Sequence, residues 1–282
     1  MSEPDWDDLI ARALAGELAA LEGIVRGLQD RVYALALRFL WTPQDAEDAT
    51  QEILIRIVTR LDRFEGRSKF TTWAHRVAVN HLLDSKASRA EQARVSFEAL
   101  DHELVAIRPS RDLERDVDFA RQRARVELAC LHGMLLGLDR DQRMALLLGV
   151  VLELEGPDAA ALLDISPARY RKRLSRAKQR LGEFMQRRCG LVDEAAACRC
   201  EHWVGQADAN RRLAPYLEVG AALERSGEHE RLAEVYGDEL AAIDRIARLY
   251  RRRDLQAPQR VLAEIMQIMQ TLGGRELALL RN

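Results

Sequence analysis

The sequence has no apolar run that approaches the roughly 20 residues needed to cross a membrane as a helix. Its first residues are acidic and lack the basic and apolar pattern of a secretory signal. Stretches with strand-forming alternation are scarce, whereas Ala, Leu, Arg and Glu dominate. We therefore expect an all-α protein that is located in the cytoplasm and makes no membrane contact.

Recognisable catalytic patterns are missing as well. The sequence has no Gly-rich phosphate loop, no nucleophile beside a base and no carboxylate cluster near its cysteines. We therefore expect no enzymatic activity and no required cofactor. The 282 residues are 48% hydrophobic and 31% charged, which suffices for two or three small folded domains. The net charge of −2 hides strong local asymmetry.

The segment that begins at Thr42 predicts a helix with one acidic face. Thr42 is a suitable N-cap, and Pro43 occupies the first helical position, where a missing N–H is tolerated. Asp45, Asp48 and Glu52 recur at helical spacing and share one face, while another face is apolar. Interaction with the helix dipole explains Asp45 well and Glu52 poorly. The acidic face suggests a protein-binding surface.

A loop and a second helix follow, up to Asp84. We expect Thr71 or Thr72 to cap this helix. Its aromatic, basic and amide side chains are of the kinds that stack on bases, meet phosphates and read base edges in single-stranded nucleic acid. The alternative is a Trp that anchors the core and an amide without a role. The candidate contacts are Arg67, Lys69, Trp73, Arg76 and Asn80.

The second concentration of basic residues follows a short apolar helix and a tight turn. Ser166 can cap the next helix, Pro167 can begin it, and no acid occurs from there to Gly182. This order is that of a helix-turn-helix, whose second helix enters the major groove of DNA. An ordinary solvated basic face is the alternative. The candidate DNA contacts are Ser166, Ala168, Arg169, Tyr170, Arg171, Arg173 and Arg176.

Several ordered motifs resemble those of a known family. D-A-E-D-x-x-Q-E from Asp45, F-x-G-x-S-x-F-x-T-W from Phe64 and N-x-x-x-D from Asn80 are similar to region two of extracytoplasmic-function (ECF) sigma factors. R-L-S-R-A-K from Arg173 is similar to region four of the same family. The resemblance implies region two over residues 1–88, a linker over 89–118, region four over 119–185 and a helical extension over 186–282.

The resemblance implies a sigma factor that binds core RNA polymerase, recognises promoter DNA and promotes its melting. The region-two segment would bind the minus-ten element, and the helix from Ser166 the minus-thirty-five element. The implied partners are the beta-prime clamp and beta flap of core polymerase and promoter DNA, with an anti-sigma protein or other regulator as a further candidate. A conventional helix-turn-helix regulator that does not bind core polymerase is the alternative. The residues implied in core binding are Asp45, Asp48, Gln51 and Glu52.

Three of the four cysteines cluster at the start of the extension. Cys189, Cys198, Cys200 and His202 could supply a tetrahedral zinc site, although the usual Cys-x2-Cys spacing is missing. Buried thiols and a redox-sensitive pair are equally open alternatives. A metal enzyme built on these ligands is a second rival to the sigma factor. The fourth cysteine, Cys130, is expected in the core.

The rest of the extension is again helical in its periodicity. Apolar stripes over residues 208–225, 229–252 and 258–272 suffice for a small bundle. Such a bundle could stabilise region four as a cap. Alternatively, it could be a built-in regulatory domain that occludes a DNA- or polymerase-binding face.

Overall fold

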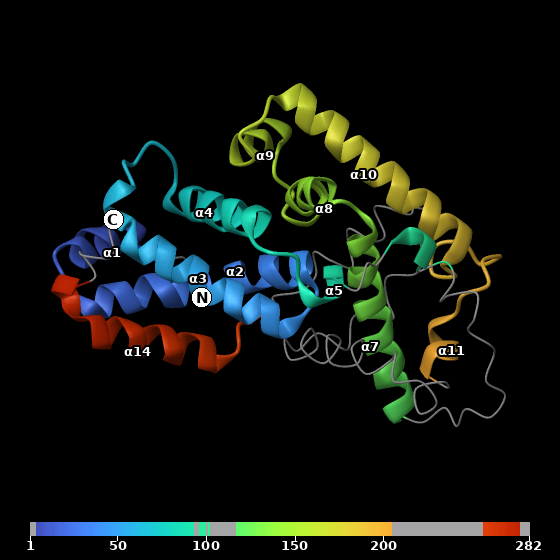
Figure 1. The fold of residues 1–282 in the computed structure, drawn as a ribbon, viewed down its shortest axis with the longest axis horizontal. Helices are drawn as coiled ribbons and strands as arrows, with labels where there is room; N and C mark the ends of the chain where they lie inside the picture. Colours follow the sequence, from blue (N-terminus) through green and yellow to red (C-terminus); the bar gives the residue numbers. More distant parts are fainter. Residues whose placement is uncertain (1–3, 93–95, 100, 102–116, 205–255, 277–282) are drawn as a thin grey trace. The chain divides into compact units, whose positions relative to one another are not determined.

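Helices make up the fold (Figure 1). The computed structural model describes residues 4–92, 96–99, 101, 117–204 and 256–276. Within these ranges no strand forms, and an isolated β-bridge joins Cys189 to Cys198, so the all-α prediction is confirmed. In the same ranges no helix is both long and apolar enough to span a membrane. The helices expected over 208–225 and 229–252 lie outside the described residues.

The chain divides into two units. Unit 1 comprises Met1–Leu37, Gln44–Lys86 and Leu255–Asn282. Unit 2 comprises Arg38–Pro43 and Ala87–Asp254. The end of the extension therefore belongs to the same unit as the region-two segment, although most of unit 2 lies between them in sequence.

Unit 1 contains long helices joined by short turns. Asp5 caps the first helix because its Oδ1 accepts a hydrogen bond from the N–H of Asp8 at 3.2 Å. Gly16, with φ +92, permits the turn into the second helix. The helices are α1 (Trp6–Leu14), α2 (Leu18–Leu40, whose last residues fall in unit 2), α3 (Pro43–Thr59), α4 (Phe70–Asp84) and α14 (Gln259–Glu276).

The starts of α3 and α4 test two sequence predictions. Helix α3 begins at Pro43, as predicted. Helix α4 begins at Phe70 with Lys69 in the N-cap position and no side-chain cap, so the prediction that Thr71 or Thr72 caps it is wrong. The Phe70 side chain is only 3% exposed, and its ring centroid lies 5.1 Å from that of Trp6. Packing of this aromatic ring, and not a hydroxyl cap, accompanies the start of α4.

Unit 2 contains the expected helix-turn-helix. Asp139 caps α8 by accepting a hydrogen bond from the N–H of Gln142 at 2.7 Å. Ser166 caps α10 in the same way, from the N–H of Arg169 at 3.2 Å, and Pro167 is its first residue, as predicted. The helices are α5 (Arg89–Gln92), α7 (Val117–Met134), α8 (Arg140–Leu146), α9 (Gly156–Leu162), α10 (Pro167–Arg188) and α11 (Cys200–Val204).

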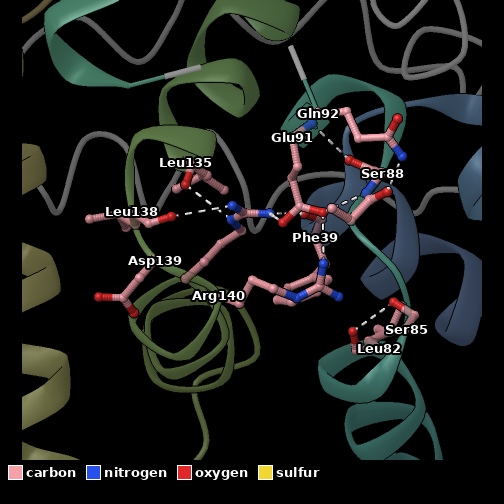
Figure 2. Close-up of polar contacts among 12 residues, drawn as sticks. Phe39, Leu82, Ser85, Ser88, Glu91, Gln92, Leu135, Leu138, Asp139 and Arg140 are labelled. Carbon is pink, nitrogen blue, oxygen red and sulfur yellow. Dashed lines mark hydrogen bonds and ion pairs between the residues drawn. The ribbon is translucent and has the colours of Figure 1, made fainter. Parts of the chain in front are cut away.

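A buried arginine, Arg143, connects separate segments of unit 2, and its partners Phe39, Glu91, Leu135 and Leu138 are labelled in Figure 2. Arg143 is 2% exposed and donates to the carbonyl oxygens of Phe39 at 2.6 Å, Leu135 at 3.1 Å and Leu138 at 3.2 Å. Its Nη1 also lies 2.9 Å from the Glu91 carboxylate. Burial lowers the pKa of Arg143, and the Glu91 charge opposes that shift. The first residues of the expected linker are therefore fixed by a buried ion pair.

Glu91 also holds its own helix together. Its carboxylate accepts a hydrogen bond from the N–H of Ser88 at 2.8 Å, while the Ser88 hydroxyl accepts one from the N–H of Glu91 at 3.2 Å. This reciprocal pair is a capping box. Arg140 adds a second cation, since its Nη1 lies 2.7 Å from the Glu91 carboxylate. The Glu91 carboxylate thus caps α5 and also forms the ion pair with Arg143.

Candidate protein and nucleic-acid interfaces

The acidic face of α3 is divided between exposed and occupied positions. Asp48 and Glu52 are exposed, and the Glu52 side chain retains 62% of its accessible surface. Asp45 is half-buried near the helix start. Gln51 is half-buried too, and its amide nitrogen donates a hydrogen bond to the carboxylate of Glu264 in α14. The predicted residues share α3, but only part of the face is open.

Glu47 is a polar residue of α3 that the sequence analysis did not identify. It is 6% exposed, and its carboxylate forms an ion pair with Arg260 of α14, with Nε 2.5 Å from Oε2. The Arg260 side chain is 64% exposed, so the pair lies at the edge of the unit. The sequence showed an amphipathic pattern near the chain end, but this pattern does not indicate that the segment packs against α3.

The loop before α4 and the outer face of that helix carry exposed cations and an amide. Arg67, Lys69, Arg76 and Asn80 are all exposed. The Arg67 guanidinium pairs with Glu65 but keeps 82% of its side-chain surface accessible. These four residues are available to a ligand of unit 1.

Trp73 combines features of its two predicted roles, a core anchor and a ring that stacks on bases. The ring is half-buried and stacks on Phe70, with centroids 5.7 Å apart and an interplanar angle of 25°. A second contact joins it to Phe64, also with centroids 5.7 Å apart. Trp73 is therefore an anchor for the aromatic cluster and still contributes accessible ring surface.

Two histidines titrate on the same helix. His81 is 6% exposed, and burial lowers its pKa, with the charge of Arg56 adding to the shift. Burial also lowers the pKa of His75, and Arg31 adds to that effect. Both side chains are therefore neutral near pH 7, and α4 does not gain positive charge from them.

Helix α10 presents the predicted basic surface. Its N-cap Ser166, Ala168, Arg169, Arg171 and Arg176 are exposed. The positive end of the helix dipole lies at the same end as these side chains, and both favour a phosphate. The first turns of α10 can therefore meet a nucleic-acid backbone.

Two of the expected DNA contacts are engaged within unit 2. Tyr170 is 1% exposed, and its hydroxyl donates to the carbonyl oxygen of Ala145 at 3.1 Å, so it packs α10 onto α8 and cannot contact DNA from this position. A Cβ at Gly149 would lie 2.3 Å from the Tyr170 hydroxyl, so this glycine makes room for the ring. Arg173 is half-buried and pairs with Asp141 at 2.8 Å.

All four cysteines gather in unit 2. Cys189 at the end of α10 forms the β-bridge with Cys198, and the N–H of Gly190 donates to the Cys198 carbonyl oxygen at 3.1 Å. Cys200 begins α11, which packs against α7, the helix of Cys130. Burial raises the pKa of Cys130, and the proximity of the other three cysteines adds to that shift. Cys130, predicted to lie in the core, is half-buried, and no sequence pattern connects it with the other three.

Cys189 is buried, the other three cysteines are half-buried, and all four pKa values are raised. Burial raises the pKa of Cys189 to about 11 and the pKa values of Cys130 and Cys200 well above the ordinary value. Among the described residues, no three Cys, His, Asp or Glu side chains are arranged to hold a metal ion. The predicted zinc set, which also included His202, is therefore not assembled. The arrangement fits packed, protonated thiols better than it fits a zinc site.

Comparisons with known proteins match two separate regions of the chain. The family Sigma-70 region 2 matches residues 24–92, and the family Sigma-70, region 4 matches residues 128–181. The RNA polymerase sigma-H factor of Pseudomonas aeruginosa is 29% identical over 196 residues, which cover 66% of this chain and 96% of that relative. The ECF RNA polymerase sigma factor SigE of Mycolicibacterium smegmatis is 27% identical over 193 residues, which cover 68% of this chain and 66% of that relative.

A solved structure of CnrH in complex with the cytosolic domain of CnrY is 24% identical, with a TM-score of 0.45, and the match covers 63% of this chain and 95% of that one. The matches to regions two and four occur in the order that the sequence motifs predicted. They fall on the helices that carry the acidic face and the capped basic helix. The chain therefore contains both Sigma-70 regions, and together with its relatives they support an ECF sigma factor.

Proposed function

We propose that this sigma factor docks on the beta-prime clamp of core RNA polymerase through α3. The observation that carries the proposal is an exposed acidic face, Asp48 and Glu52, in the same chain as a capped basic helix-turn-helix. Asp45 and Gln51 flank that face and complete the proposed contact. Carboxylates on a rigid helix are suited to a cationic partner surface, and charge complementarity speeds and orients association.

The second proposed contact is with the melted minus-ten element of a promoter. The exposed Arg67, Lys69 and Arg76 supply cations for phosphates, Asn80 supplies an amide for a base edge, and Trp73 supplies ring surface for stacking. A protein that binds the melted form better than the duplex shifts the equilibrium toward melting. Neither ATP nor a catalytic residue is needed for that step.

The third proposed contact is with the minus-thirty-five element as duplex. The start of α10 would enter the major groove, with Arg169 and Arg171 near base edges and Arg176 on phosphate. Region four, over residues 119–185, would also meet the beta flap, while residues 1–88 form the polymerase-docking and melting half. The linker over 89–118 would connect them.

The proposal requires no cofactor. Burial and raised pKa values support inert thiols at Cys189, Cys198 and Cys200. We propose that the protein acts in the cytoplasm, where core polymerase and promoter DNA are found. A separate anti-sigma protein or other regulator stays a prediction.

Reconstituted transcription tests the function directly. Purified full-length protein is mixed with core polymerase and a promoter library, and new transcripts are sequenced. We expect transcripts that start downstream of a shared pair of promoter elements. A protein that binds promoter duplex but neither binds core polymerase nor supports transcription would instead be a conventional helix-turn-helix regulator.

A further inference from the structure

Helix α14 buries one face within unit 1. Val261, Ile265 and Met269 recur at a spacing of four in α14, and their exposed fractions are 0%, 0% and 2%. Positions at this spacing form one stripe of a helix. In Figure 1 the helix runs alongside α2 and α3. The apolar stripe therefore marks the face by which α14 is docked.

Polar contacts identify the surface beneath the stripe. The N–H of Ala257 donates to Asp30 of α2 at 2.7 Å. Arg260 pairs with the buried Glu47 of α3, and Glu264 accepts a hydrogen bond from Gln51 one turn further along α3. The contacts join the end of the extension to the helix proposed for polymerase docking.

This contact overlaps the proposed docking face. Gln51 belongs to that face, and Glu47 directly precedes Asp48 on the same helix. Because the Gln51 amide donates to Glu264, a partner that binds this amide competes with that contact of α14. Asp48 and Glu52 stay exposed, which leaves core polymerase a place to make its first contact.

We propose that α14 is a built-in competitor of core polymerase for the α3 face. The inference rests on the proposed function of α3 and adds the identity of the segment that regulates it. If core polymerase binds only the form in which α14 is undocked, the apparent dissociation constant for core is the intrinsic value divided by the undocked fraction. By linkage, core binding must weaken the docking of α14 to the same extent.

The principal test measures core affinity with a fluorescently labelled full-length chain. Val261→Asp places a charge in the buried stripe, and Ala263→Asp places the same charge at an exposed position of the same helix. We expect Val261→Asp to bind core on the order of ten-fold more tightly, because an unpaired buried carboxylate strongly disfavours the docked state. The Ala263→Asp control should bind as the wild type does.

A milder pair of variants separates the ion pair from net charge. Arg260→Gln removes the partner of Glu47, and Gln270→Glu changes the net charge by the same amount at an exposed site. We expect Arg260→Gln to bind core about two- to five-fold more tightly, as the loss of a partly exposed ion pair predicts. Gln270→Glu should leave the affinity for core polymerase unchanged. This second pair of variants still tests the inference if Val261→Asp fails to fold.

Hydrogen exchange on the wild-type protein supplies an independent measurement. The amides from Val261 to Met269 should exchange slowly in the free protein and faster in the complex with core polymerase. Unchanged protection on binding, together with unchanged or weaker core affinity of Val261→Asp and Arg260→Gln, would overturn the inference and leave the proposed function intact. Failure of every form to bind core, including the wild type, would instead refute the proposed function.

Discussion

Helix α3 of unit 1 and helix α10 of unit 2 expose opposite charges, and the two units bury different ionisable groups. Unit 1 presents Asp48 and Glu52 on α3 and withdraws the imidazoles of α4 from water. Unit 2 presents Arg169 and Arg171 on α10 and buries the guanidinium of Arg143 and the thiol of Cys189. The outer charges suit a basic protein surface and DNA, respectively.

The units also differ in how these surfaces are covered. One flank of α3 is occupied by α14, whereas the exposed cations at the start of α10 are directly accessible. The interior of unit 2 is tied together by Arg143 and Glu91, but α14 is held by a stripe of small and medium apolar side chains and a pair at the edge. The two ion pairs thus lie at different depths, as expected if the first contact is permanent and the second is displaced in the way we propose for α14.

The largest effect is expected from the buried pair. Arg143→Met should lower the free energy of unfolding of unit 2 by about 3 kcal/mol, because Glu91 loses a buried partner and three carbonyl oxygens lose a donor. Urea unfolding followed by hydrogen exchange of the α8 amides measures the loss. The control, Arg169→Met, removes an exposed arginine and should leave stability unchanged. Equal stability of both variants would refute a structural role for Arg143.

Charge reversal on the two faces should produce reciprocal defects. Asp48→Arg should weaken core binding roughly ten-fold or more and spare binding of minus-thirty-five duplex, because like charges across an interface repel. Arg171→Glu should do the reverse. Core affinity and duplex affinity are measured for both variants by fluorescence anisotropy. Loss of both activities in either variant would show that the two faces are not independent.

A smaller effect, of opposite sign in the two units, is expected from pH. Burial lowers the pKa of His81 below its ordinary value of 6.5, so its contribution to unit 1 is present above pH 6.5 and is lost as pH falls through the folded pKa. His75 acts in the same direction. In unit 2, burial raises the pKa of Cys189 from 9.0 to about 11, so that contribution is present below pH 9 and is lost toward pH 11.

Hydrogen exchange resolved by unit, between pH 5 and pH 10, would measure this difference after correction for intrinsic exchange rates. We expect the α4 amides to lose protection first on the acid side and the amides around Cys189 to lose it first on the alkaline side. His81→Gln should reduce the acid response of unit 1, where His75 still titrates, and leave the response of unit 2 unchanged. A common pH profile for both units would contradict the assignment.

Local chemistry predicted much of this fold. The N-cap Ser166 and the first-turn prolines of α3 and α10 act within a few residues, so their sequence patterns carry the whole signal. The order of the two helical modules was readable for the same reason. Element type and helix starts governed by side-chain caps therefore needed no tertiary information.

Tertiary packing decided the rest. Helix α4 begins at Phe70 because aromatic rings meet there, although two threonines offered caps. Glu47 meets Arg260 from the far end of the chain, and no local pattern joins them. Cys130 joins cysteines beyond residue 188 only after α7 and α11 pack. Each of these features depends on residues that are distant in sequence.

Substitutions at Tyr170 and Arg171 separate the residue that packs α10 against unit 2 from a residue that is proposed to contact DNA. Tyr170→Phe removes the hydroxyl that bonds Ala145 and should lower the free energy of unfolding of unit 2 by about 1 kcal/mol, the usual value for one hydrogen bond. Its affinity for minus-thirty-five duplex should be unchanged, because the ring is buried. The neighbouring Arg171→Ala should show the opposite pattern, with unchanged stability and a salt dependence of DNA binding reduced by about one phosphate contact. A Tyr170→Phe protein that is fully stable but binds DNA weakly would place this tyrosine on the DNA after all.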